Sequence, residues 1–261
     1  GQTGTNAFFI SIGLSIVFVS LLVCKKRKNF SNIILFIVCF IALFMTGKRG
    51  FIMGNFIAMA ITYYYYSEEV SSNRIKKYIK YFIGANLISL FVYLAYLFIP
   101  SVNLALNRFF VSSSQMTDIS SGRFGLYNLA LQTFIDNPIS GVGIDAFTYI
   151  PYAGNLQNVG AHNDWFQFLA EIGLVGTLML LYFIVKTLKQ TIIIIKDRRL
   201  DAQFKPFIYL SLYTQLYILF HSLVGMPFHN YSMLLIYIIF ASIPYAITNR
   251  VKDNFYSEVT K

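Results

Sequence analysis

The sequence predicts an all-α protein: a polytopic bundle of about seven transmembrane helices, with one large extracytoplasmic loop that contains short helices. Hydrophobic residues make up 56% of the 261 residues, and charged residues only 12%. A soluble domain carries about 25% charged residues, so much of this surface must face lipid. The apolar stretches also run unbroken, without the alternation that the strands of a membrane barrel need. Helices, which satisfy their backbone hydrogen bonds internally, are therefore expected to cross the bilayer.

Seven apolar stretches are the expected spans. Each would form a helix of roughly 24–29 Å, slightly short of a hydrocarbon core, and flanking residues can make up the difference. The run Tyr63–Tyr66 fits such an interfacial belt. Four spans fall in 1–99, a loop occupies 100–166, and three spans with a cytoplasmic tail fill 167–261. The predicted spans are 7–23, 30–46, 51–66, 81–99, 167–185, 206–223 and 231–247.

The basic residues predict the orientation. Cytoplasmic segments of membrane proteins carry the excess of Lys and Arg. If the N-terminus lies outside, all the Lys and Arg fall in inner segments except Lys48, Arg49, Arg108 and Arg123. The same distribution explains the net charge of +10, which therefore does not indicate nucleic-acid binding. We expect a multi-pass protein of the plasma or inner membrane whose long loop is extracytoplasmic.

The long loop is predicted to contain one amphipathic helix. Ser120 and Ser121 can cap a helix over about 123–135, and Asp136-Asn137-Pro138 ends it. Such a helix would lie on the membrane surface or pack over the bundle. Its apolar face is expected to consist of Phe124, Tyr127, Ala130, Leu131, Phe134 and Ile135.

Two glycines follow this helix. The run Gly141-Val-Gly143-Ile-Asp-Ala146 fits the Gly-x-Gly-x-x-Ala pattern of dinucleotide-binding proteins. That pattern needs a strand before it and a βαβ unit around it, neither of which is expected here. Gly141 and Gly143 are instead predicted to let the loop pack closely against a helix or a ligand.

His162 is the candidate catalytic residue. It lies in the outer loop at the mouth of a span, two residues before Asp164. An ordinary imidazole is mostly neutral at pH 7 and can take a proton from a hydroxyl group. The alternative is a divalent-cation site that His162 would form with Asp164 and Asp145. The other histidines, His221 and His229, flank a short outer turn, where packing or interfacial hydrogen bonds are expected.

Three basic residues are candidates for phosphate binding. Lys48 and Arg49 lie in the turn TGKRG (46–50), and Arg123 starts the loop helix. A guanidinium can hold phosphate with two parallel hydrogen bonds, and a helix N-terminus adds backbone N–H donors. Lys48 would assist Arg49 as a point charge. The alternative is that these side chains snorkel to lipid headgroups.

Together these residues resemble the O-antigen ligase/polymerase family, whose members join glycans at the outer face of the membrane. GQTGTNAF (1–8) is similar to the family's Gly/Asn entry to a span. TGKRG (46–50) is similar to its Thr-Gly-Ser-Arg-Gly turn, with Lys48 in place of the serine. SGRFGLYNLALQTFIDNPISGVGIDAF (121–147) resembles the run that opens the large outer loop. AHNDWFQFLAEIGLVG (161–176) resembles the His-Asn … Glu-x-Gly-x-x-Gly run that closes it.

The resemblance implies a metal-independent glycosyltransferase that needs no cofactor. Its donor would be a glycan on polyprenyl pyrophosphate, and its acceptor a glycan or a lipid-linked repeat unit. His162 would take the proton of the acceptor hydroxyl. Arg49, Arg123 and Lys48 would bind the departing pyrophosphate. The residues expected to orient the imidazole or to bind sugar hydroxyls are Asn163, Asp164, Glu171 and Asp145.

The resemblance also implies a longer protein with further partners. Family members have about a dozen spans, and this chain starts at Gly1 without a signal peptide, so it is expected to be a C-terminal portion. Other polysaccharide-assembly proteins are expected partners besides the bilayer, and nucleic acid is not. The composition, rich in Ile, Asn, Lys, Tyr and Phe, and the compact loop favour a polymerase for capsule or another surface polysaccharide over a ligase.

Two other classes of protein compete with this hypothesis. A transporter of a glycolipid or a small anion would show internal repeats or charged residues near the middle of its spans, and the sequence shows neither. A non-catalytic scaffold of a polysaccharide-assembly complex would tolerate changes in the outer loop.

Overall fold

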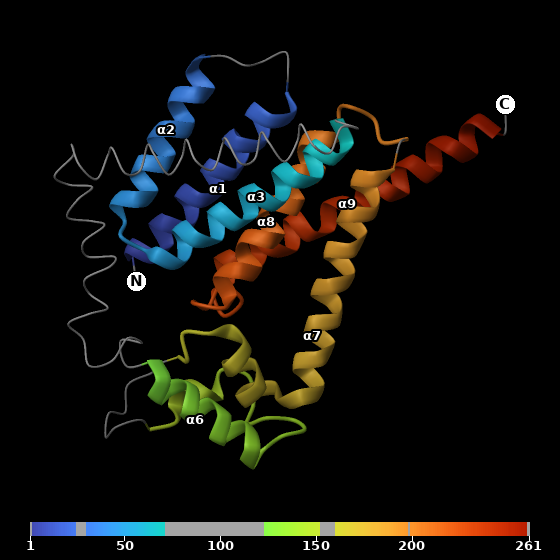
Figure 1. Cartoon of the computed structure of the whole chain (residues 1–261). Helices are drawn as coiled ribbons and strands as arrows, with labels where there is room; N and C mark the ends of the chain where they lie inside the picture. The colour runs from blue at the N-terminus through green and yellow to red at the C-terminus, as the bar shows by residue number, and fades with distance from the viewer. Residues whose placement is uncertain (1, 25–29, 71–122, 152–159, 198, 260–261) are drawn as a thin grey trace. The chain divides into compact units, whose positions relative to one another are not determined.

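The computed structural model describes residues 2–24, 30–70, 123–151, 160–197 and 199–259. Within these ranges the backbone forms helices and turns and no strand, which confirms the all-α prediction for this part of the chain (Figure 1). The helices divide into two units, which are described separately. The elements are α1 (Gln2–Val23), α2 (Phe30–Met45), α3 (Arg49–Val70), α6 (Arg123–Asp136), the 3-10 turn η2 (Ala146–Tyr149), α7 (Asp164–Lys196), α8 (Lys205–Ser222) and α9 (Tyr231–Val259).

The first unit holds α1, α2 and both ends of α3. α1 and α2 pack side by side, with the rings of Phe18 and Phe36 6.4 Å apart between centroids. The turn after α2 uses Gly47 at a φ of 63°, which glycine adopts without steric penalty. Arg49, which the sequence suggested for this turn, is the first residue of α3.

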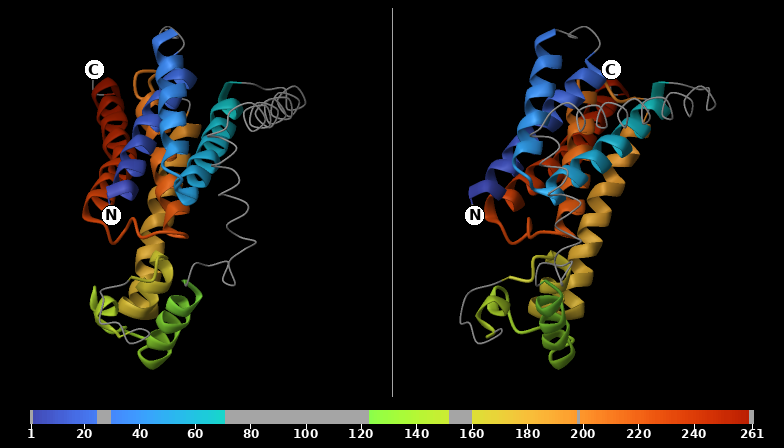
Figure 2. Two further views of the ribbon diagram at one scale, coloured as in Figure 1. Left: turned by 90° about the vertical axis from the view of Figure 1, so that its left-hand side faces the viewer. Right: turned by 60° about the vertical axis from the view of Figure 1, so that its left-hand side comes forward.

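The second unit holds α6, η2, α7, α8 and α9, together with residues Met53–Ala58 of α3. That short stretch is joined to α8, where the Tyr213 hydroxyl donates to Oδ1 of Asn55 at 2.7 Å. α7 packs against α6, α8 and α9, and α8 packs against α9. The start of α7, the end of α8 and the start of α9 meet at one end of the unit, where α6 also lies (Figure 2).

Neutral polar side chains join the helices in the middle of the second unit. Gln215 of α8 donates to Thr191 of α7 at 2.8 Å and to Ser211 of its own helix at 2.9 Å. The hydroxyls of Thr187 and Tyr237 lie 3.3 Å apart and connect α7 to α9. All five side chains are buried. These bonds therefore pair polar groups for which an apolar surrounding offers no other partner.

Three described helices are long and apolar enough to cross a membrane: Gly4–Val23, Asp164–Lys196 and Tyr231–Thr248. α2 is apolar but shorter. The predicted span 81–99 lies outside the described residues. The helices thus support a membrane protein, while the number of seven spans and the extracytoplasmic side of the loop remain predictions.

The predicted end of the loop helix is confirmed by α6. The helix is described from Arg123 and ends at Asp136, directly before Asn137-Pro138. A proline disfavours the helical conformation in the residue before it, which explains the stop. The proposed capping residues Ser120 and Ser121 lie outside the described residues.

The predicted apolar face of this helix is only partly right. The buried positions of α6 are Leu126, Ala130 and Thr133, whereas Phe124 and Ile135 are 62% and 70% exposed. The helix packs on α7, as expected for a helix that lies over the bundle, and its placement on the membrane surface stays a prediction.

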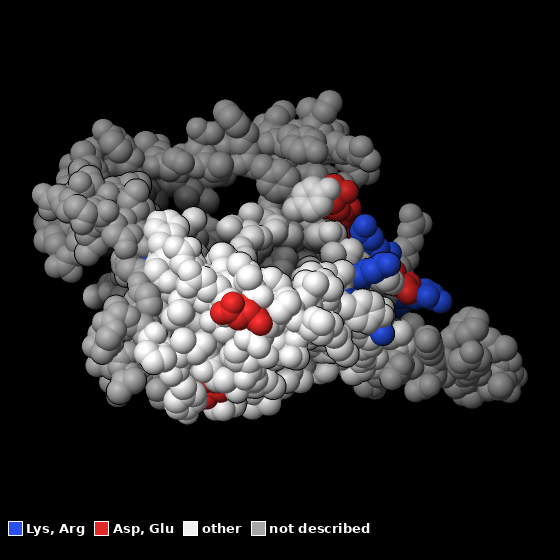
Figure 3. Space-filling view, turned by 90° about the horizontal axis from the view of Figure 1, so that it is seen from below, with Lys and Arg blue, Asp and Glu red and all other residues white. Residues whose placement is uncertain are grey.

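Apart from Arg123 of α6, the basic side chains described in the second unit gather away from α6. Seen from the α6 end, the described surface is mostly uncharged, and the basic side chains lie at one edge (Figure 3). This asymmetry follows the expected excess of Lys and Arg on the cytoplasmic side. The basic residues in question occupy the second half of α7 and its connection to α8: Lys186, Lys189, Lys196, Arg199 and Lys205.

Candidate functional site

His162 lies in the segment that leads into α7. It is exposed, and its φ of 55° places it in the left-handed region that residues other than glycine seldom adopt. Such a conformation persists where the surroundings hold it, and it is frequent at functional sites. The next residue, Asn163, caps α7 by accepting hydrogen bonds from the backbone N–H groups of Trp165 and Phe166 at 2.9 and 3.2 Å. The imidazole is thus presented on the surface at a fixed helix start.

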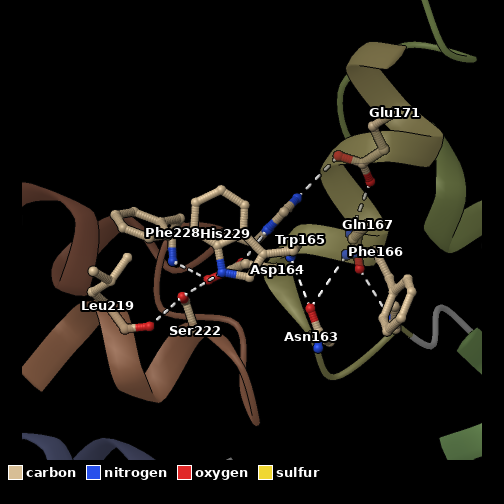
Figure 4. Close-up of polar contacts among 11 residues, drawn as sticks. Asn163, Asp164, Trp165, Phe166, Gln167, Glu171, Leu219, Ser222, Phe228 and His229 are labelled. Atoms are coloured by element: carbon tan, nitrogen blue, oxygen red, sulfur yellow. Dashed lines mark hydrogen bonds and ion pairs between the residues drawn. The ribbon is translucent and has the colours of Figure 1, made fainter. Parts of the chain in front are cut away.

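His229 lies between two carboxylates of α7 (Figure 4). Its Nδ1 is 2.5 Å from Oδ1 of Asp164, and its Nε2 is 3.0 Å from Oε2 of Glu171. Both carboxylate side chains are fully buried, and the imidazole is 13% exposed. Phe168 covers the ring at 4.6 Å between centroids. Buried carboxylates are tolerated only when they are paired, so His229 stabilises both of them.

The pKa of His229 reflects this position. Burial alone would lower the pKa, because it disfavours the charged imidazolium. The hydrogen bonds to Asp164 and Glu171, together with the charges of these carboxylates, outweigh burial and raise the pKa to about 9. At pH 7 His229 is therefore an imidazolium that donates from both ring nitrogens, and it cannot act as a base.

Gln167 extends this network to the other side of His162. Its Nε2 donates to Oε1 of Glu171 at 2.8 Å, and its Oε1 accepts from the backbone N–H of Ala161 at 2.9 Å. Gln167 itself is fully buried. The same hydrogen-bond network therefore fixes Ala161, directly before His162, and Asp164, two residues after it.

The turn between α8 and α9 (residues 223–230, here called the α8–α9 turn) binds several predicted site residues. Three consecutive carbonyl groups of this turn accept hydrogen bonds from them. Arg123 of α6 is thereby brought to the turn that also holds the segment carrying His162. The pairs are the Leu223 carbonyl with Nδ2 of Asn163 at 2.9 Å, the Val224 carbonyl with Nη1 of Arg123 at 3.2 Å, and the Gly225 carbonyl with the N–H of Asp164 at 3.2 Å.

The loop after α6 binds a break in α7. Gly173, at a φ of 63° and a ψ of −168°, interrupts the helix in a region that only glycine populates readily. The N–H groups of Val142 and Gly143 bond to the carbonyls of Ala170 and Glu171 at 3.0 and 2.8 Å. Carbonyls at a helix end lack helical partners, and the loop supplies them. The backbone that carries Glu171 is therefore fixed on two sides.

Close approach explains why glycine stands at two of these positions. A Cβ on Gly141 would lie 2.3 Å from the carbonyl carbon of Glu171. A Cβ on Gly173 would lie 2.3 Å from the carbonyl oxygen of Ile139. The prediction that Gly141 lets the loop pack closely against a helix is confirmed, and that helix is α7.

The remaining acidic candidate, Asp145, stands apart from this network. It is exposed, has a φ of 64°, and precedes η2, where its carbonyl accepts from the Thr148 hydroxyl at 2.8 Å. Among the residues that the structure describes, no three His, Cys, Asp or Glu side chains are placed to hold one metal ion. The divalent-cation alternative for His162, Asp164 and Asp145 thus gains no support there, since Asp164 is engaged with His229.

Lys48 and Arg49 belong to the first unit, and both are exposed. The second unit contains Arg123 and His162. The convergence of Arg49 with these two residues remains a prediction.

The carboxylates of Asp164 and Glu171 have a partner that the sequence did not suggest. They were expected to orient His162 or to bind sugar hydroxyls, but both are fully buried and contact His229. One signal was available. Asp164 and Glu171 are seven residues apart, so they lie on one face of a helix. Two buried acids on one face require a cation, and His229 is the histidine that supplies it.

Comparison with known proteins gives one match. The family model described as O-antigen ligase matches residues 34–181, which is more than half of the chain. No curated protein and no solved structure matches. The matched range contains Arg49, Arg123, His162 and Glu171 and ends before α8, so the α8–α9 turn lies outside it.

Proposed function

Because the chain belongs to the O-antigen ligase family, we propose that it transfers a glycan from a polyprenyl pyrophosphate carrier to a sugar hydroxyl at the outer face of the plasma or inner membrane. The observation that carries this proposal is the arrangement around the α8–α9 turn. His162 is exposed and has a constrained backbone, and the side chain of the next residue, Asn163, bonds to this turn. The guanidinium of Arg123 bonds to the same turn. An acceptor base and a cation for the leaving group are the two functions that such a transfer requires.

His162 is the proposed general base. The acceptor oxygen attacks the anomeric carbon of the donor sugar, and the new carbon–oxygen bond forms as the bond from that carbon to the pyrophosphate oxygen breaks. The electron pair of the broken bond leaves with the pyrophosphate, and the hydroxyl proton passes to the imidazole. A positioned base contributes on the order of 10²–10⁴ in rate. His229 cannot replace it at neutral pH because its nitrogens already donate to two carboxylates.

Arg123 is the proposed partner of the leaving pyrophosphate. One of its N–H groups is bonded to the Val224 carbonyl, which directs the guanidinium towards the α8–α9 turn. A guanidinium carries five N–H donors, so this bond does not exhaust its capacity for phosphate oxygens. Arg123 is also the first described residue of α6, and if the helix begins there, as the sequence predicts, its N-terminus would favour an anion. Arg49 and Lys48 are proposed to share this role.

Metal ions are not required in this proposal. Pyrophosphate is a good leaving group, and fixed cations can neutralise the charge that grows on it in the transition state. Asn163, Asp164 and Glu171 act by holding the site rather than by touching the sugars, because their side chains are buried. Asp145 is exposed and remains a candidate for contact with sugar hydroxyls.

Transfer in proteoliposomes tests this proposal. The purified protein, extended by any segments that precede Gly1, is reconstituted with a purified lipid-linked repeat unit. The proposal expects products longer than one repeat unit, release of free polyprenyl pyrophosphate, and activity that persists in a chelator. Addition of a single glycan to a different acceptor would indicate a ligase. Movement of intact donor across the bilayer without release of pyrophosphate would indicate a transporter and contradict the proposal.

A further inference from the structure

We infer that His229 is a positioning residue: as a cation between Asp164 and Glu171, it fixes the α8–α9 turn on the start of α7 and thereby sets His162 and Arg123 for transfer. The inference rests on the proposed function, which it extends to a residue outside the range matched by the family model. His229 touches neither reacting atom in this scheme. It acts through the start of α7, which directly follows His162, and through the α8–α9 turn, to which the Arg123 side chain is hydrogen-bonded.

His229 contacts both sides of the junction, by which we mean the contact between the end of α8 with the α8–α9 turn and the start of α7. Its own backbone belongs to the α8–α9 turn, while both of its ring nitrogens contact α7, at Asp164 and Glu171. The neighbouring N–H of Phe228 donates to the second oxygen of Asp164 at 3.0 Å. Trp165 adds one more bond across the junction, from its Nε1 to the Ser222 hydroxyl at 2.9 Å. The turn and the helix start are therefore joined by hydrogen bonds and by the contacts of His229, whose strength depends on the charge of the imidazole.

Loss of the proton from His229 would remove the cation from a buried site. Two carboxylates would then face a neutral ring that can donate from one nitrogen only, and each buried charge would keep much of its desolvation penalty. The other titratable groups at the turn cannot compensate by moving in. Arg123 is held at Val224 from α6, and the ring of His221 from α8 lies against Gly225, where a Cβ would be 2.7 Å from it. The turn is thus expected to separate from α7.

Separation of the turn would disturb both proposed catalytic groups together. The carbonyls of Leu223 and Val224, which hold Asn163 and Arg123, belong to the same turn as His229. Asn163 directly follows His162 and caps α7, whereas Arg123 is bonded to the turn, so separation of the turn from α7 would move the base and the guanidinium relative to each other. A misplacement of about 1 Å can lower a rate by about 10²-fold.

The dependence of the transfer rate on pH tests this inference. In the wild-type protein we expect the transfer rate to fall as the pH passes about 9, where His229 loses its proton. His229→Lys keeps a cation with an ordinary pKa of about 10.4, so the fall should move to higher pH. His229→Gln should be slowed about 10²-fold, without a fall near pH 9.

A second readout does not depend on activity. Trp165 is the only tryptophan of the chain, and its Nε1–Ser222 bond crosses the junction. Its emission should change as the pH passes about 9 in the wild type and at higher pH in His229→Lys. If the wild type shows no transfer but its emission follows this pattern, the proposed function fails and the junction stands. If transfer occurs but both the fall in rate and the change in emission stay at the wild-type pH in His229→Lys, the inference is overturned.

A charge-matched double variant separates charge from folding. His229→Gln leaves two buried carboxylates without a cation, whereas Glu171→Gln combined with His229→Gln restores the original net charge of the cluster. We expect the double variant to transfer faster than His229→Gln and to show no alkaline fall. Equal rates in the two variants, with both proteins inserted and monodisperse, would contradict a role of the His229 charge. If His229→Gln does not fold, His229→Lys and the double variant still decide the question.

Discussion

The second unit contains two buried polar networks of different kinds. The network in its middle is neutral and joins α7, α8 and α9 through Gln215, Thr191 and the Thr187–Tyr237 pair. The network at its α6 end holds two carboxylates and an imidazole. Neutral bonds between membrane helices contribute about 0.6 kcal/mol each. Buried ions each cost several kcal/mol in lost solvation. Neutral hydrogen bonds are therefore enough to pair the helices, and the charged network is not needed for that purpose. Because the charged network lies beside His162, we infer that it serves the function of the site.

The largest effect on stability is expected from Gly173→Ala, which would disrupt the charged network at the α6 end and leave the middle network in place. The new methyl group would meet the Ile139 carbonyl oxygen at 2.3 Å, in a backbone conformation that only glycine adopts readily. We expect a loss of more than about 3 kcal/mol in the free energy of unfolding. Thermal unfolding in detergent measures it. Gly4→Ala is the matched control, since a Cβ there meets no atom within 4 Å. Equal unfolding midpoints in the two variants would show that the break in α7 tolerates a side chain.

Arg123→Ala should act on transfer rather than on stability. The side chain is only partly buried, so its removal should change stability little, while loss of one donor to the leaving group lowers a rate by about 10²–10³-fold. Arg123→Lys keeps the charge but loses the planar fork and should recover only part of the rate. The measurement is the initial rate of polyprenyl pyrophosphate release. An unchanged rate in Arg123→Ala would show that Arg123 does not bind the leaving group. The charged network would then have no functional connection to α6.

The stability of the two networks should respond differently to pH. The pKa of His229 in the folded protein, about 9, lies above its unfolded value of about 6.5. Its contribution to stability is therefore fully present below about pH 6.5 and is lost as the pH rises through about 9. Unfolding midpoints between pH 6 and 9.5 should fall for the wild type and stay nearly level for His229→Gln. A wild-type midpoint that rises or stays level over this range would contradict the paired cluster.

The smallest effect is expected from Tyr237→Phe in the middle network. The change removes only the hydroxyl that lies 3.3 Å from Thr187, and the Thr187 hydroxyl still donates to the Ile184 carbonyl. We expect a loss of about 0.6 kcal/mol in stability and an unchanged transfer rate. A large loss of transfer would mean that the middle network also serves the reaction, and the contrast between the two networks would disappear.

Local signals in the sequence predicted the helices well. The Asn137-Pro138 pair fixed the end of α6, and the apolar runs marked α1, α2, α7, α8 and α9. The face of α6 was harder to predict, because Phe124 and Ile135 are as apolar as the residues that it buries. Which of two apolar faces meets α7 depends on the shapes of both partners. Those shapes depend on contacts between segments far apart in the chain.

The candidate site was predicted only where its residues are close in sequence. His162 to Glu171 form one continuous motif, whereas His229 lies 65 residues after Asp164. No spacing rule connects an imidazole in a turn with carboxylates on a distant helix. The pairing follows from the antiparallel packing of α7 and α8, which places the α8–α9 turn at the start of α7. A search for the cation that buried Asp164 and Glu171 require would have narrowed the candidates to few residues.

The most direct measurement is the rate of glycan transfer by His162→Ala beside the wild type, in proteoliposomes with a purified lipid-linked repeat unit. The Trp165 emission and the insertion of both proteins are measured as well, so that a disturbed start of α7 is distinguished from the loss of the base. The proposed mechanism expects the rate to fall on the order of 10²–10⁴-fold, because the acceptor hydroxyl loses its base. A His162→Ala protein that makes polymer of normal length at the wild-type rate would contradict catalysis at this site.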